Sequence, residues 1–93
     1  MKEYIKERIF QNFQSSYQQI NFDKNDKKII FSFFDEVDLT DYMSIKRMSM
    51  IITQYLKNKP KYYGTNSLNL RIICMSFGFP NSTELKQYLE NNQ

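Results

Sequence analysis

The sequence contains no histidine and only one cysteine, Cys74. Without histidine, zinc sites of the usual Cys/His kind and catalytic triads with a histidine base are excluded. A single cysteine cannot form an intrachain disulfide. Cys74 lies in an apolar, helix-like stretch without a base partner, so we expect a small structural residue rather than a nucleophile. There is also no glycine-rich phosphate loop, and we therefore expect no cofactor, no metal and no enzyme activity.

Glycine and proline are scarce, with two of each in 93 residues. This is too little for a loop-rich or disordered chain. Eight Phe and seven Tyr can bury large areas, so even a short chain can form a core. The length fits one domain, and we treat residues 1–93 as a single helical domain.

No apolar run approaches the roughly 20 residues that a membrane-spanning helix needs. Met1 is followed by a charged, amphipathic segment, which is unlike the apolar core of a signal peptide. From these patterns we expect a cytoplasmic protein that does not enter the membrane.

Acidic residues are missing from Tyr42 to Thr83, a run of 42 residues. Six cations lie in this run: Lys46, Arg47, Lys57, Lys59, Lys61 and Arg71. Four carboxylates cluster just before it: Asp35, Glu36, Asp38 and Asp41. No histidine accompanies these carboxylates, so an acidic helix end or loop explains them better than a metal site does. A basic run favours a polyanionic partner, and a merely solvated basic face is the alternative.

Apolar residues recur at helical spacing in the N-terminal segment, which predicts a helix over residues 2–19. The stripe consists of Ile5, Ile9, Phe13, Tyr17 and Ile20. If the protein is a homodimer, this stripe is the surface that we expect the two copies to share.

Residues 27–37 are apolar on almost every side, so periodicity does not separate a buried helix from a buried strand. A cap at Asp26 favours a helix, whereas the β-branched and aromatic content favours a strand. We choose a helix and leave the strand open.

Ile45, Met48 and Ile52 predict a third helix, capped by Thr40 or Ser44 and closed at Lys57. The methionines Met43, Met48, Met50 and Met75 are expected to fill gaps in the core. A break at residues 61–66 has room either for an extended loop or for a short strand or hairpin, as in a winged fold. A fourth helix follows, capped by Asn66 or Ser67. The expected fold is all-α, a compact single domain of four to five helices.

The C-terminal third has the outline of a helix-turn-helix unit. Cys74 is small enough for a second helix to cross close by, and Gly78 tolerates the positive φ that a tight turn needs. Asn81 and Glu84 have the spacing of a helix cap. Leu85, Tyr88 and Leu89 are expected to face the core.

Residues 67–91 resemble the second helix-turn-helix of AraC-type regulators. The matching positions are Ile73-Cys74, Gly78-Phe79, Asn81-Ser82 and Leu85. The resemblance covers about 20 residues, and the first of the two units that such domains carry is not found here. It implies a small DNA-binding protein, either a transcriptional regulator or a plasmid or phage accessory factor.

On this interpretation the last helix enters the major groove of double-stranded DNA, and cations outside it contact phosphates. The candidate residues are Lys57, Lys59, Lys61, Arg71, Ser82, Thr83, Lys86 and Gln87. Glu84 and Glu90 bring negative charge to the same helix, which works against docking on phosphates. The alternative to DNA binding is a non-enzymatic protein-protein interaction module or a small inhibitor or adaptor. Tyr62 and Tyr63 between lysines also fit a platform for single-stranded nucleic acid, although such pairs are more often half-buried anchors.

Overall fold

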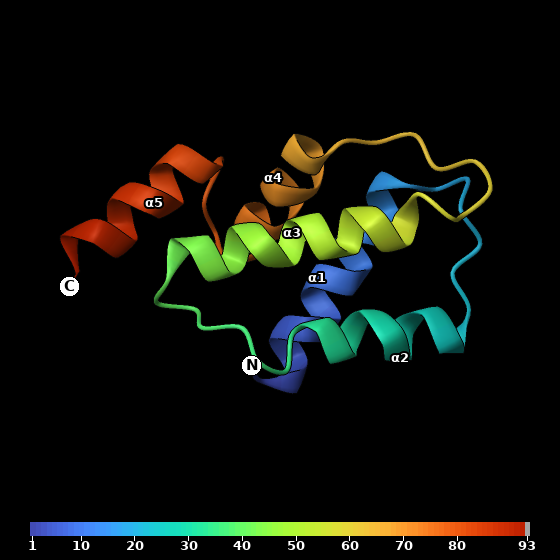
Figure 1. The fold of residues 1–93 in the computed structure, drawn as a ribbon, viewed down its shortest axis with the longest axis horizontal. Coiled ribbons are helices and arrows are strands. Elements are labelled where there is room, and N and C mark those ends of the chain that lie inside the picture. Colours follow the sequence, from blue (N-terminus) through green and yellow to red (C-terminus); the bar gives the residue numbers. More distant parts are fainter. Residues whose placement is uncertain (93) are drawn as a thin grey trace.

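The computed structural model describes residues 1–92 and forms five α-helices (Figure 1). They are α1 (Glu3–Ser16), α2 (Lys24–Phe33), α3 (Tyr42–Leu56), α4 (Asn66–Ser76) and α5 (Ser82–Asn91). The expected all-α class is confirmed. No strand occurs within residues 1–92, so of the two alternatives for residues 61–66 the structure has the loop and not the strand. The uncertain segment 27–37 is helical up to Phe33.

The domain is built around α1, α3 and α4, with α2 and α5 packed at its periphery. In Figure 1, α2 and α3 run antiparallel, α1 crosses them steeply, and α5 stands apart beside the first turn of α3. The molecule measures 40 × 23 × 19 Å, and its long axis follows α3. Helix α5 lies toward one end of this axis, beyond the first turn of α3, and the loop between α3 and α4 lies toward the other end (Figure 1).

The apolar stripe of the N-terminal helix is part of the core and is not a free surface. Ile9, Phe13, Tyr17 and Ile20 are buried, and only Ile5 is partly accessible. They pack in one cluster with residues of α3 and α4 such as Ile52. The expectation that this stripe joins two copies is therefore wrong, because the apolar area is already used for folding.

Side-chain caps stand at the start of α2, α3, α4 and α5, although three of them differ from expectation. Asp23, not Asp26, caps α2, and the two form a reciprocal capping box. Asp41 caps α3 in place of Thr40 or Ser44, and Thr65 caps α4 one residue before Asn66. Each observed cap lies within three residues of an expected one, because several neighbouring polar side chains are suitable caps.

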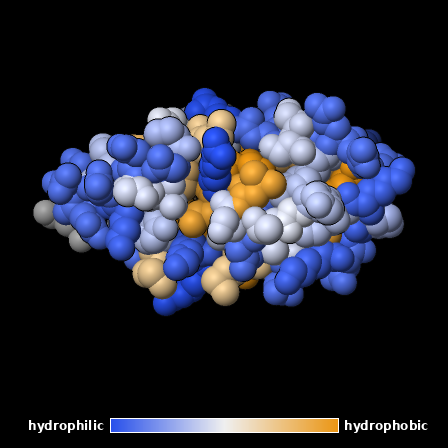
Figure 2. All heavy atoms as spheres, turned by 90° about the horizontal axis from the view of Figure 1, so that it is seen from above, coloured by the Kyte–Doolittle hydropathy of each residue, from blue (hydrophilic) through white to orange (hydrophobic). Residues whose placement is uncertain are grey.

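The outer face of α3 remains uncovered. Of the methionines expected in the core, only Met48 is buried there. Met43 and Met50 are each 48% exposed and Ile51 is 49% exposed, all on this helix. Met75 on α4 is also exposed. Figure 2 shows how apolar side chains come to the surface between hydrophilic ones when the molecule is seen from above.

Candidate nucleic-acid interface

The turn between α4 and α5 has the geometry that the sequence predicts. Gly78 has a φ of 91°, in the left-handed region that favours glycine. Its amide donates to the carbonyl of Met75 at 3.0 Å, and the amide of Phe79 donates to the carbonyl of Cys74 at 3.0 Å. These two bonds form a Schellman motif, which satisfies carbonyls that α4 leaves free at its end. The turn is therefore a fixed corner.

Helix α5 starts at a capped end and touches the rest of the domain along a narrow line. The Asn81 side chain accepts from the amide of Glu84 at 2.9 Å. Leu85 is buried, and Leu89 is half-buried. Tyr88, expected in the core, is instead 53% exposed, and its ring packs on Phe79 with centroids 5.1 Å apart. Most of the surface of α5 consequently faces outward.

The outward surface of α5 carries three of the four predicted DNA-binding residues of this helix. Thr83, Lys86 and Gln87 are exposed, and Ser82 is half-buried. The Lys86 ammonium lies 5.8 Å from the centre of the Tyr42 ring, so its stem leans toward the start of α3. Glu84 and Glu90 are exposed on the same helix. The charge of this face is therefore mixed, as two carboxylates and one ammonium share it.

The predicted phosphate contacts are not beside α5. Lys57 and Lys61 are exposed at the C-terminal end of α3, which is the opposite end of the molecule from α5 (Figure 1). Arg71 is exposed on α4 between these ends. The structure thus separates Lys57 and Lys61 from the four predicted residues of α5 by the length of α3, and it places Arg71 between them.

Lys59 is not available to a phosphate. It forms an ion pair with Asp26, which is buried. The Tyr55 hydroxyl also donates to this carboxylate at 2.5 Å. Burial raises the pKa of Asp26, but the hydrogen bonds from Lys59 and Tyr55 outweigh it and lower the pKa to about 2. Asp26 and Lys59 therefore tie α2 to the end of α3, and Lys59 has a structural role.

Two cations beside the hairpin, Arg8 and Lys46, are not among the DNA-binding residues predicted from the sequence, although Lys46 belongs to the basic run. Arg8 of α1 donates to the carbonyl of Ser76 at 3.4 Å, at the last residue of α4. Lys46 is exposed one helical turn after Tyr42, the residue that Lys86 approaches. Arg8 lies 68 residues before Ser76 in the chain, so only the packing of α1 on α4 places it there.

Cys74 is fully buried, as expected of a small packing residue. Burial raises the pKa of its thiol to about 11, so the thiolate is scarce at neutral pH. Within residues 1–92, no three histidine, cysteine or carboxylate side chains come together in a way that would hold a metal ion. None of the helices in that range is long and apolar enough to span a membrane.

Comparison with models of protein families finds no match to this chain. Comparisons with curated proteins and with solved structures find no significant match either.

Proposed function

We propose that this protein binds double-stranded DNA through α5, acting as a small regulator or accessory factor. The observation that carries the proposal is the hairpin itself. The Schellman turn at Gly78 and the Asn81 cap hold α5 at a fixed angle to α4. With Leu85 as its buried anchor, α5 leaves Thr83, Lys86 and Gln87 accessible. A major groove admits one such helix, and amide and hydroxyl groups can contact base edges there.

Phosphate contacts on this model come from the cations around the hairpin, namely Lys86, Lys46 and Arg8. The carboxylates Glu84 and Glu90 oppose them, so we expect low affinity for one copy and a strong dependence on salt. Lys57 and Lys61 are too remote from α5 to contribute to the same groove (Figure 1).

The test is the binding of purified protein to a random pool of DNA duplexes at about 50 mM salt, by gel shift and fluorescence anisotropy. We expect binding that weakens as salt rises. Lys86→Glu should weaken it, and Glu84→Gln should strengthen it, since the two changes move the charge of the α5 face in opposite directions.

The matched control is Lys28→Glu, which makes the same charge change at an exposed site on α2. If Lys28→Glu weakens binding as much as Lys86→Glu does, the effect is one of net charge and α5 is not the contact. Failure of the wild-type protein to bind any duplex at low salt would remove the proposal.

The second candidate function is a non-enzymatic protein-protein interaction module. It is favoured by the outer face of α3, defined as Met43, Arg47, Met50, Ile51 and Gln54, which is uncovered by the fold. Half-exposed methionines adapt well to a partner surface, and the helix carries cations but no carboxylates. A partner for this face would combine apolar and acidic side chains.

A further inference from the structure

Tyr63 is the most exposed of the large hydrophobic side chains, with 93% of its surface accessible. It lies in the loop between α3 and α4, and the ring of the preceding residue, Tyr62, is half-buried. An aromatic ring that is fully solvated gains nothing for the fold. The burial of apolar surface therefore does not explain why Tyr63 stands where it does.

The backbone of this loop is fixed on both sides of Tyr63. Lys61 has a φ of 67°, a left-handed conformation that residues other than glycine rarely adopt. Gly64 packs against α1's end so closely that a Cβ there would meet the Tyr17 hydroxyl, the Tyr62 hydroxyl at 2.8 Å and a Tyr17 ring carbon at 2.9 Å. A strained residue that persists in such a loop is held by its surroundings, and strain of this kind gathers at functional sites.

A buried hydrogen-bond network holds the base of the loop. The Tyr17 hydroxyl donates to the Asn69 side-chain oxygen, and the Asn69 amide donates to Thr53 at 2.7 Å and to the Tyr62 hydroxyl at 3.1 Å. The rings of Tyr17 and Tyr62 are 5.3 Å apart. Burial, together with the nearby Tyr62 hydroxyl, raises the pKa of Tyr17, so its proton stays in place at neutral pH. Tyr62 is thus anchored while Tyr63 points outward.

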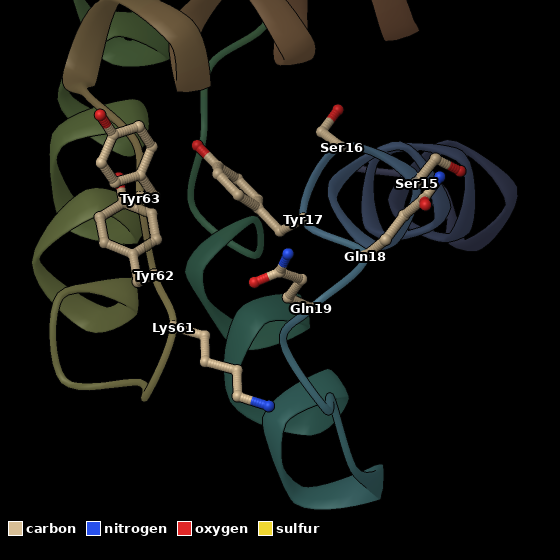
Figure 3. Close-up of a pocket in the computed structure, with 8 residues that line it drawn as sticks. All are labelled: Ser15, Ser16, Tyr17, Gln18, Gln19, Lys61, Tyr62 and Tyr63. Carbon is tan, nitrogen blue, oxygen red and sulfur yellow. The ribbon is translucent and has the colours of Figure 1, made fainter.

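Tyr63 separates two open hollows. In Figure 3 the first hollow has Tyr62, Tyr63 and Lys61 on one side and Gln18 and Ser15, from the end of α1, on the other. The second hollow lies against the start of α4 and is lined by Lys57, Thr65 and Leu68 as well as by both tyrosines. Each hollow therefore has the same ring as a wall and a lysine within it.

The two lysines are free to meet an anion. Among residues 1–92, no ion pair involves Lys57 or Lys61, in contrast to Lys59. Both are exposed, and no carboxylate occurs in the sequence between Tyr42 and Thr83. Two hollows that share an aromatic ring and carry one lysine each match a chain in which phosphates alternate with bases.

We propose that Tyr63 is a stacking platform for single-stranded nucleic acid, with a base on its ring and with Lys57 and Lys61 holding the phosphates on either side. Duplex bases are already stacked and paired, so only an unpaired base can use this ring. Both hollows are open and both are lined by Tyr63, which suits a strand that passes across the loop. The site lies at the opposite end of α3 from α5 and does not depend on the DNA-binding role of α5 (Figure 1).

The experiment is fluorescence anisotropy with labelled oligothymidylate and oligouridylate of about ten nucleotides, at low salt. Tyr63→Ala should weaken binding about tenfold, whereas Tyr63→Phe should bind as the wild type does, because stacking needs the ring and not the hydroxyl. Replacing Lys57 and Lys61 by Gln should weaken binding and make it less dependent on salt. The folded state of each variant is checked by thermal unfolding.

The matched control is Tyr4→Ala, which removes another exposed tyrosine from the far end of α1 and should leave the affinity unchanged. The proposal is overturned if the wild-type protein ignores both oligonucleotides, if Tyr63→Ala binds normally, or if a mononucleotide binds as tightly as the strand. Lys86→Glu should not alter single-strand binding and Tyr63→Ala should not alter duplex binding, so the two sites can fail separately.

Discussion

Asp26 shows how much structure one buried carboxylate can organise. It accepts from the amide of Asp23 at 2.9 Å within α2, from the Tyr55 hydroxyl of α3, and from Lys59 just beyond α3. These bonds lower its pKa to about 2, and burial and the bond to Asp26 raise the pKa of Tyr55 to about 12. The negative charge is therefore the form that the fold stabilises.

The charge of Asp26 should make the free energy of unfolding depend on pH. Because the folded pKa of Asp26 is depressed from 3.8 to about 2, its stabilisation is complete above pH 3.8 and is lost as the pH falls through 2. The difference between the unfolded and the folded pKa of Asp26 corresponds to about 2 kcal/mol of the free energy of unfolding. Urea unfolding between pH 2 and pH 7 should show this loss of stability in the wild type but not in the Asp26→Asn protein. At pH 7 the Asp26→Asn protein should be less stable than the wild type.

Glu36→Gln is the control for Asp26→Asn, since Glu36 is exposed. The Glu36→Gln protein should lose stability at low pH as the wild type does. An Asp26→Asn protein with the pH dependence of the wild type would show that the charge of Asp26 does not stabilise the fold.

At the scale of the elements, the corner between α4 and α5 depends on one backbone conformation. A Cβ at Gly78 would meet no atom within 4 Å, so a side chain there has room. The φ of 91° is nevertheless strained for any residue with a Cβ. The cost of substitution is thus conformational and not steric.

We expect Gly78→Ala to lower the free energy of unfolding by about 1 kcal/mol, because alanine is disfavoured in the left-handed region. Gly78→Asn should cost less, since asparagine tolerates that region better. Urea unfolding measures the change in the free energy of unfolding of the whole domain. Amide hydrogen exchange should show that the loss of protection is concentrated in α5. Equal stability of the alanine and glycine proteins would mean that the turn changes its conformation.

For the whole molecule, the uncovered face of α3 is the surface available to a second copy. In an antiparallel pairing of two such helices, the Lys57 end of one copy lies opposite the Asp41 end of the other. The acidic residues before α3 and the cations after it then complement each other. This pairing would also place the two α5 helices at opposite ends of the assembly.

Sedimentation over a range of protein concentrations should therefore show a monomer–dimer equilibrium that Met50→Glu shifts toward monomer. The folded monomer should tolerate this change, because Met50 is half-exposed. Met75→Glu, at an exposed methionine of α4, is the matched control. A protein that stays monomeric at high concentration, or a Met75→Glu variant with the same effect, would exclude this face as the contact.

Reasoning from the sequence succeeded where neighbouring residues decide. The helical class follows from apolar spacing, and the turn at Gly78 and the cap at Asn81 follow from local backbone chemistry. It failed for Met43 and Met50, because hydrophobicity alone does not say which face another helix will cover. It also failed for Lys59, whose partner Asp26 lies 33 positions earlier in the chain. The base-contacting role of α5 stays a prediction.

The sequence by itself determined that this chain forms helices, that it turns at Gly78, and that residues 42–83 carry cations without carboxylates. Only the tertiary structure decided where those cations lie, because the packing of α1, α3 and α4 sets distances that the order of residues does not contain. It separated Lys57 and Lys61 from α5, brought Arg8 beside the hairpin, and paired Lys59 with Asp26. It also exposed Tyr63 on a fixed loop, since long-range contacts among Tyr17, Tyr62 and Asn69 hold that loop in place.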